Sequence, residues 1–424
     1  MVDLPKVKDV EKTKTWQEID LRILLTKGAR SLGAGSPTDA GLSRISTTSV
    51  ANPIVLAGGV PDPATLPVDD LLKAIGHVLT THPDESLRYG GVHGFDGLRT
   101  ALAERQSRIE GIPLVPENFL IDNGSAGGID TICDAFVESG DVVIVESPTF
   151  SGSLRTIKGH MAEIAPVPLD DQGIMVDRVA EVIRRTEKSG KRVKLVYTIS
   201  DFHNPTGVTM SPERRSNLVS LCAEHHALIV EDAAYSDIYF GSQPPVSLYT
   251  LAEGQGIFKV GTFSKPIATG LRIGWVQGRP DYIEALAQVR FDMGNSPLLQ
   301  MALAKYVASG MLNTHLEKVR PLYAEKCETL CKSLRDHCAQ YIRFRKPEGG
   351  FFLWVECVGP QAQDVAREAI EEGIFFPLGA AFFFGREADD TSHIRLSFST
   401  ATLKELSEVG PRLRAAFDRA IGER

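Results

Sequence analysis

A lysine that follows two hydroxyl residues is the strongest chemical feature of the sequence. Lys265 closes the segment Thr262-Phe263-Ser264-Lys265, and Arg272 lies seven residues further along. A lysine amine can form a Schiff base with an aldehyde when it is neutral for enough of the time, and both burial and a neighbouring cation lower its pKa. Because Arg272 can be that cation, we expect Lys265 to perform covalent chemistry on an aldehyde.

Asp232 follows an apolar run, where a carboxylate without a cationic partner is costly. A protonated pyridine nitrogen can be that partner, and a protonated ring is a strong electron sink for carbanion chemistry. Tyr235 and Asn204 can bind the phenolic oxygen of such a ring, and Phe150 can stack on its face. These residue types therefore predict a site for an aromatic ring that carries an aldehyde.

A phosphate group on that ring would need backbone N–H groups at the start of a helix and nearby hydroxyls. The segment Gly124-Ser125-Ala126-Gly127 opens a predicted helix that runs to Val137. Thr262 and Ser264 can supply the hydroxyls.

Each of these residues also has a structural interpretation. Asp232 can cap a helix that starts at the next residue, and Asn204 can start a turn before a proline. Phe150 can be a core residue. Arg395 lies in an alternating strand pattern and can be an exposed charge at a sheet edge, and Lys265 by itself could be a solvated surface charge.

The elements that position these residues follow from the hydrophobic pattern. Apolar runs alternate with amphipathic segments, which is typical of an α/β domain with a mostly parallel sheet. We predict helices at 127–137, 176–186 and 212–225, and strands at 142–146, 193–199, 227–231, 257–263 and 272–277. In such sheets ligands bind at the carboxyl ends of the strands, where the polar residues above are expected to converge.

Changes in polarity and in the spacing of apolar residues along the chain suggest three regions. Residues 1–55 predict an N-terminal arm that contributes to a small domain, residues 56–310 a large ligand-binding domain, and residues 311–424 a small α+β domain. Apolar residues at helical spacing from Leu312 to Leu334 predict a helix long enough to connect the two domains.

The overall charge narrows the range of partners. The 424 residues contain 46 Lys and Arg against 54 Asp and Glu, a formal net charge of −8, which argues against broad binding to nucleic acid. No apolar run approaches a membrane span, and the N-terminus lacks the apolar core of a secretory signal. We therefore expect a cytoplasmic protein. Cys327 and Cys331, which lie near His337 and Cys338, suggest buried thiols rather than a metal site, and we predict no metal.

Nine stretches in order then establish a resemblance. They are LAGGVPDPATLP (56–67), RYGGVHGFDGLR (88–99), IDNGSAGGID (121–130), VESPTFSG (145–152), DFHNPTG (201–207), EDAAY (231–235), GTFSKPIATGLRIGW (261–275), PEGGFFLW (347–354) and HIRLSF (393–398). With them the chain resembles the class I/II aminotransferases of fold type I, which use pyridoxal 5′-phosphate (PLP). Its stretches are most similar to the subgroup of 2-aminoadipate and aromatic aminotransferases.

The resemblance implies a role for each residue. Lys265 would carry the aldimine and move the proton, Asp232 would pair with the pyridinium, and Tyr235 and Asn204 would bind the ring hydroxyl. Relatives commonly have tyrosine where Phe150 stands. The other implied cofactor contacts are Ser125, Ala126, Thr262, Ser264, Arg272 and, from the neighbouring subunit of a homodimer, Tyr89. The implied substrate contacts are Gly58, Gly59, Asn204 and Arg395.

Three functions remain open at this stage. The first is transfer of an amino group between an amino acid and a 2-oxo acid. The second uses the same cofactor for β- or γ-elimination, replacement or cyclisation, which the motifs do not separate from transfer. The third is a transcriptional regulator with an aminotransferase-like domain, which we disfavour because the 50 or so residues before the first motif show no helix-turn-helix pattern.

Overall fold

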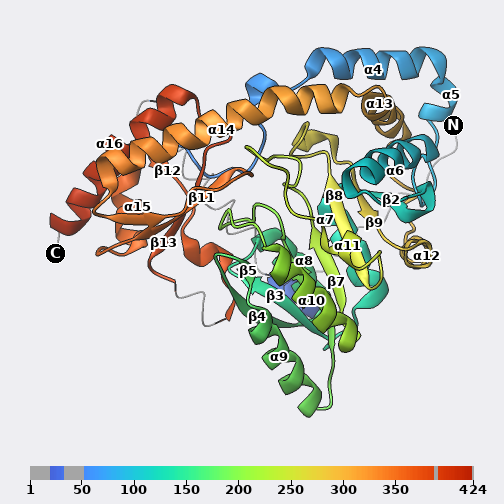
Figure 1. Ribbon diagram of the computed structural model, residues 1–424, viewed down its shortest axis with the longest axis horizontal. Coiled ribbons are helices and arrows are strands. Elements are labelled where there is room, and N and C mark those ends of the chain that lie inside the picture. The colour runs from blue at the N-terminus through green and yellow to red at the C-terminus, as the bar shows by residue number, and fades with distance from the viewer. Residues whose placement is uncertain (1–19, 33–51, 386–389, 423–424) are drawn as a thin grey trace, which may run out of the picture.

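An eight-stranded mixed sheet forms the centre of the molecule. The computed structural model describes residues 20–32, 52–385 and 390–422 (Figure 1). The strand order is β2-β9-β8-β7-β6-β3-β4-β5. The bounds are β2 (Phe119–Asp122), β3 (Val142–Ser147), β4 (Glu163–Asp170), β5 (Gly173–Ile174), β6 (Val193–Thr198), β7 (Leu228–Asp232), β8 (Ile257–Thr262) and β9 (Gly274–Gln277). Strands β4, β3, β6, β7 and β8 run parallel, whereas β9 is antiparallel to both β8 and β2.

Both faces of this sheet are buried, which explains why its strands are apolar throughout. Successive side chains of a strand point to opposite faces. In β3, Val143 and Val145 belong to one apolar cluster, whereas Val142 and Ile144 belong to another. The covering helices are α6 (Asp96–Glu110), α7 (Gly124–Phe136), α8 (Ser151–Gly159), α9 (Val176–Lys188), α10 (Pro212–Glu224), α11 (Leu248–Leu251) and α12 (Pro280–Gln288).

A second, three-stranded antiparallel sheet lies in the C-terminal part. Its order is β10 (Ile342–Phe344), β11 (Phe352–Cys357) and β13 (His393–Ser397). Helices α15 (Ala362–Glu371) and α16 (Leu403–Gly422) and the second half of α14 (Met311–Cys338) share an apolar cluster with this sheet. The short strand β1 (Ile54–Val55) pairs in parallel with β12 (Ile374–Phe375).

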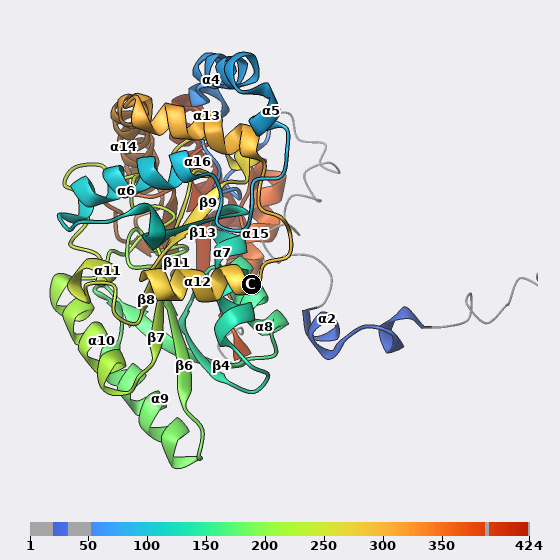
Figure 2. The ribbon, with the colours of Figure 1, turned by 90° about the vertical axis from the view of Figure 1, so that its right-hand side faces the viewer.

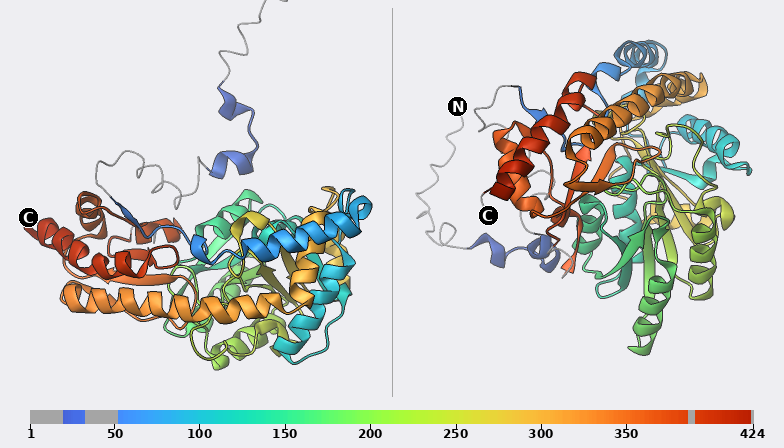
Figure 3. Two further views of the ribbon diagram at one scale, coloured as in Figure 1. Left: turned by 90° about the horizontal axis from the view of Figure 1, so that it is seen from above. Right: turned by 60° about the vertical axis from the view of Figure 1, so that its left-hand side comes forward.

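Helix α14 connects the two sheets. Seen from above, it runs along most of the molecule, from α13 (Pro297–Ala308) to the C-terminal helices (Figure 3). Its N-terminal half contributes Leu312, Leu316 and Val319 to the large part, and its C-terminal half contributes Leu330 and Leu334 to the small part. The predicted connecting helix is therefore confirmed, while the domain limits at residues 55 and 310 stay a prediction.

The N-terminal segment lies to one side of the body. The 3-10 turn η1 (Leu21–Ile23) and helix α2 (Lys27–Leu32) project on the right in Figure 2, while α4 (Val68–Thr81) and α5 (Pro83–Ser86) lie at the top. Helix α2 contacts α8, where Arg155 Nη1 donates to the carbonyl of Leu32 at 2.7 Å. Gly28 lies so close to Gly159 that an added Cβ would be 2.4 Å from its carbonyl oxygen. Much of the expected arm, residues 1–19 and 33–51, lies outside the described residues.

Candidate active site

The carboxyl ends of four neighbouring parallel strands bring the predicted residues to one edge. Phe150 follows β3, Asn204 follows β6, Asp232 ends β7, and Thr262 ends β8. Since β3, β6, β7 and β8 pair in that order and in parallel, their ends lie side by side. The predicted residues therefore converge at one edge of the sheet, the edge where open α/β sheets bind ligands.

Lys265 lies just past the end of β8, with its amine inside this edge. Its Nζ donates to the carbonyl of Gly59 at 2.8 Å and lies 5.6 Å from the centre of the Tyr235 ring. Burial lowers the pKa of Lys265 to about 8, Asp232 opposes this shift, and Arg395 and Arg272 add to it. Two cations therefore lower the pKa of Lys265: Arg272, as predicted from the sequence, and Arg395.

Asp232 is 4% exposed and is held by neutral donors. Tyr197 donates its hydroxyl to Oδ2 at 2.7 Å, and the backbone N–H of Ala234 donates to Oδ1 at 3.1 Å. Burial raises the pKa of Asp232, and these two hydrogen bonds oppose the rise. The contact with Ala234 is of the capping kind, but a turn follows instead of a helix. Within the described part of the chain, Asp232 forms no ion pair.

Arg395 is buried, 2% exposed, so the alternative of an exposed edge charge is wrong. Its Nη1 donates to Asn204 Oδ1 at 2.9 Å, and its Nη2 donates to the carbonyl of Ala57. The guanidinium lies between the rings of Phe352 and Phe382, 4.2 and 4.6 Å from their centres. Its Nε has no hydrogen-bond partner among the described residues. Burial lowers the pKa of Arg395 to about 10, which leaves a cation at neutral pH with only neutral partners.

Tyr235 and Gly59 close the space between Lys265 and Arg395. Burial raises the pKa of Tyr235 above its usual value, and a hydrogen bond with Asn204 opposes the rise. The phenol therefore stays protonated. A Cβ on Gly59 would lie 2.3 Å from Phe352 Cζ and 3.3 Å from the Tyr235 hydroxyl, whereas at Gly58 the nearest atom would be 3.9 Å away. Of these two glycines, Gly59 is therefore the one whose position leaves no room for a side chain.

The residues predicted to bind a phosphate lie around the start of α7. Arg272 Nη2 donates to the carbonyl of Asn123 at 3.1 Å, just before the helix. A Cβ on Gly124 would lie 3.0 Å from that nitrogen. Thr262 Oγ1 and Ser264 Oγ are 3.0 Å apart at the end of β8. Ser125 is half-buried and Ala126 exposed in the first turn, where helical N–H groups have no intrahelical acceptor.

Two predicted residues are less clearly placed. Phe150 is half-buried at the start of α8 and packs against a core cluster, which agrees with its structural interpretation, and its contact with a ring stays a prediction. Tyr89 is 82% exposed. Its expected contact involves a neighbouring subunit and stays a prediction.

Sequence reasoning missed the layer beneath the site. Tyr197, in β6, is fully buried, and its hydroxyl lies 2.9 Å from Ser153 Oγ as well as against Asp232. Glu146, in β3, accepts from Thr198 Oγ1 at 2.6 Å and lies 3.0 Å from His203 Nε2. The available signal was a polar residue inside an apolar strand, because such a group needs a buried partner.

These residues fit a phosphorylated pyridine aldehyde. Asp232 is a buried carboxylate that forms no ion pair with any described residue, and Lys265 is an amine whose pKa is lowered. The start of α7 with Thr262 and Ser264 offers donors for a phosphate. Together these residues suit an anionic aromatic ligand. The neighbouring Arg395 guanidinium suits a carboxylate.

Fold and site together define a PLP-dependent transferase of fold type I. The family described as aminotransferase class I and II matches residues 52–412. The chain belongs to that family, whose members use PLP, and it is an aminotransferase.

Individual relatives agree with this assignment. Aromatic-amino-acid aminotransferase 1 of Thermococcus litoralis is 34% identical over 85% of this chain and 87% of its own length. The 2-aminoadipate transaminase of Thermus thermophilus is 29% identical over 85% and 89%. The crystal structure of the multiple substrate aminotransferase from Thermococcus profundus superposes with a TM-score of 0.88 at 31% identity, covering 96% of this chain and all of that one. Transcriptional regulators of the helix-turn-helix type also match, such as YisV of Bacillus subtilis at 31% identity over 79% of this chain and 68% of its length.

Proposed function

We propose that this protein moves an amino group between an α-amino acid and a 2-oxo acid, with PLP held at the carboxyl edge of the large sheet. The observation that carries the proposal is that, among the described residues, the buried Asp232 has no cationic ion-pair partner and the buried Arg395 has no anionic one. A pyridinium supplies the first partner and a substrate α-carboxylate the second.

The contacts of the cofactor follow from the positions of the side chains. Asp232 would pair with the ring nitrogen, Asn204 and Tyr235 would bind the ring hydroxyl, and Phe150 would lie against the ring. The phosphate would be bound by Ser125, Ala126, Thr262, Ser264 and Arg272. When bound, the cofactor supplies an electron sink that stabilises negative charge on the α-carbon of the substrate.

Lys265 is the group that bonds the cofactor and then moves a proton. Its pKa of about 8 keeps an appreciable fraction of the amine neutral at physiological pH. General acid–base catalysis is most efficient when the pKa of the catalytic group lies near the working pH. With the cofactor bound, the Lys265 amine would accept the proton of the substrate α-carbon as a general base and later donate it as a general acid.

Arg395 orients the substrate. Its free Nε and its Nη groups form a planar fork that suits a carboxylate, while the rings of Phe352 and Phe382 fix the plane of the guanidinium. Gly59 leaves room beside it, because any side chain there would collide with Phe352. The relatives named for aromatic amino acids and 2-aminoadipate support substrates with large side chains.

A panel of amino acids tests this function. The protein purified with PLP should absorb visible light through the lysine-bound cofactor, and Lys265→Ala should lose that band. A substrate should convert the cofactor to its amine form and release the matching 2-oxo acid in equal amount. Loss of a side-chain group without the amine form would assign elimination or replacement instead, and a preparation that binds no PLP would refute the whole proposal.

We also propose a homodimer whose partner supplies Tyr89. Leu87, Tyr89 and Phe291 are 67, 82 and 89% exposed, and the segments that carry them lie together, because a Cβ on Gly294 would lie 2.2 Å from the carbonyl oxygen of Gly91. A contiguous exposed apolar patch commonly marks an interface. Sedimentation should give twice the chain mass, and Phe291→Asp should shift the protein toward the monomer. A wild-type monomer would contradict this part alone.

The free, buried state of all six cysteines supports a reducing, cytoplasmic location. Among the described residues no helix is both long and apolar enough to cross a membrane.

A further inference from the structure

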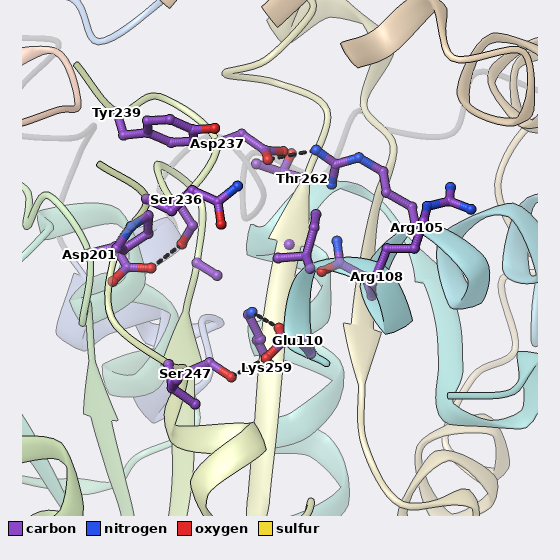
Figure 4. Close-up of a pocket in the computed structure, with 18 of the residues that line it drawn as sticks. Arg105, Arg108, Glu110, Asp201, Ser236, Asp237, Tyr239, Ser247, Lys259 and Thr262 are labelled. Carbon is purple, nitrogen blue, oxygen red and sulfur yellow. Dashed lines mark hydrogen bonds and ion pairs between the residues drawn. The ribbon is translucent and has the colours of Figure 1, made fainter. Parts of the chain in front are cut away.

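A cavity of about 510 Å³ lies beside the active site but outside it. Its walls come from α6, the segment that follows β7, the end of β8 and the start of α14 (Figure 4). Ala233, Ala234 and Thr262 form the wall nearest the active site, whereas Lys265, Asn204 and Arg395 do not line the cavity. Its volume falls within the range of small-molecule sites.

The carboxylates deep in the cavity are already neutralised. Glu110 accepts from Lys259, Ser247 and Thr250. Asp201 accepts from Arg215 and from Ser236. Figure 4 shows the Lys259–Glu110 and Ser236–Asp201 contacts as dashed lines. These acids therefore have little capacity left to bind a cation from solution.

The arginines of the cavity, by contrast, keep unused donors. Arg105 donates from Nη2 to Asp237 at 2.6 Å. Arg320 donates from Nε to the backbone carbonyl of Asp237 at 2.8 Å, and its guanidinium lies 3.7 Å from the centre of the Tyr239 ring. Arg108 forms no hydrogen bond or ion pair within the described part of the chain. Each guanidinium carries five N–H donors, so most of their donors remain free.

Arg105 and Arg320 repel each other, while Asp237 and Glu317, which also line the cavity, offset part of their charge. Burial lowers the pKa of Arg320, acids and Tyr239 oppose the shift, and the nearby charge of Arg105 adds to it. An anion beside one of these guanidinium groups would relieve this repulsion and could accept two parallel hydrogen bonds from its planar fork. The remaining wall is apolar, with Ile109, Pro244, Pro245, Val246 and Trp275.

We propose that this cavity binds a small organic anion, a carboxylate or phosphate attached to an apolar body, at Arg105, Arg108 and Arg320. The anion accepts hydrogen bonds from the free guanidinium donors, and its apolar part packs on the proline and tryptophan wall. Such a ligand lies one residue layer from Asp232, because Ala234 both lines the cavity and donates to that carboxylate.

Titration of the PLP-loaded protein with phenyl phosphate and with phenylacetate, followed by calorimetry, tests this site. Loaded protein is used because its own phosphate cradle is then filled. We expect one site per chain that remains in Arg395→Leu, which removes the carboxylate clamp of the active site. Arg108→Gln and Arg320→Gln should each weaken binding at least ten-fold, as expected for loss of a charge-assisted hydrogen bond. The matched control is Arg184→Gln, which removes an exposed arginine on α9 and should leave binding unchanged.

Three results would overturn the proposal. They are no binding of either probe at millimolar concentration, binding that disappears in Arg395→Leu, and binding that survives both Arg108→Gln and Arg320→Gln. Arg108 is exposed, so its variant should fold normally. The unfolding temperature of Arg320→Gln checks that weakened binding does not reflect misfolding.

Discussion

The hydroxyl of Tyr197 should control the pH at which the protein holds its cofactor. Tyr197→Phe removes the hydrogen bond to Asp232 Oδ2 and leaves only the Ala234 N–H on that carboxylate. The other charged or titratable groups that act on Asp232 are Lys265, which lowers its pKa, and Glu146, which raises it. Losing a donor destabilises the ionised carboxylate, so the pKa of Asp232 should rise.

The size of the effect follows from the strength of the bond. A hydrogen bond to a charged group contributes about 1.5–3 kcal/mol. At about 1.4 kcal/mol per pKa unit, its loss should raise the pKa of Asp232 by about 1–2 units. Only the ionised carboxylate pairs with a pyridinium, so PLP affinity falls as the pH drops through this pKa. The variant should lose affinity about 1–2 pH units earlier than the wild type.

The assay is the dissociation constant of PLP for the apoprotein between pH 5 and 9. Ser153→Ala is the control, because it removes the second neighbour of the Tyr197 hydroxyl and leaves the bond to Asp232 in place. It should shift the profile much less. A Tyr197→Phe profile with the wild-type midpoint would refute the reasoning, whereas a uniform loss of affinity at every pH would reduce Tyr197 to a packing role.

Three further experiments, one on pH dependence and two on variants, have defined outcomes. The rate at which apoprotein captures PLP should rise with pH and level off above about 8, because the neutral amine of Lys265 is the nucleophile; in stopped-flow absorbance, a rate that keeps rising well above pH 8 would show that the pKa of Lys265 is not lowered. Arg395→Lys should raise KM for amino acids by about 10- to 100-fold while the unfolding temperature changes little, since an ammonium cannot replace a fork fixed between two rings; an unchanged KM would remove Arg395 from the substrate site. Gly59→Ala should lower stability by about 1–3 kcal/mol through its clash with Phe352, whereas Gly58→Ala should be tolerated; equal denaturation curves for the two variants would contradict the packing argument.

The sequence predicts the large sheet well because its strands are buried on both faces. Val142–Ser147 and Ile257–Thr262 appear as continuous apolar runs that end in polar residues, so both the strands and the ligand edge are visible. Strand β4 was missed because Pro166 and Pro168 interrupt it, and prolines argue against a strand. Strand β2 was missed because its four residues carry little periodic signal.

The site was predictable as a set of residues but not as an electrostatic arrangement. Asp232, Lys265 and Arg395 each stand in a recognisable motif. That Tyr197 holds Asp232, and that Arg395 is stacked between Phe352 and Phe382, depends on strands and loops far apart in the sequence. Such pairings arise from tertiary packing, and no local pattern encodes them.

The positions of the cysteines allow local unfolding of the large and the small part of the protein to be followed separately. Cys133 and Cys222 lie in the two apolar clusters that cover the large sheet, and burial raises the pKa of each thiol to about 12. The small sheet and its helices enclose the other four, Cys327, Cys331, Cys338 and Cys357. A thiol reagent reacts with the thiolate and needs access to it. Each cysteine therefore stays unlabelled until the apolar cluster around it unfolds locally. The order in which the thiols become labelled thus reveals which half of the molecule opens first.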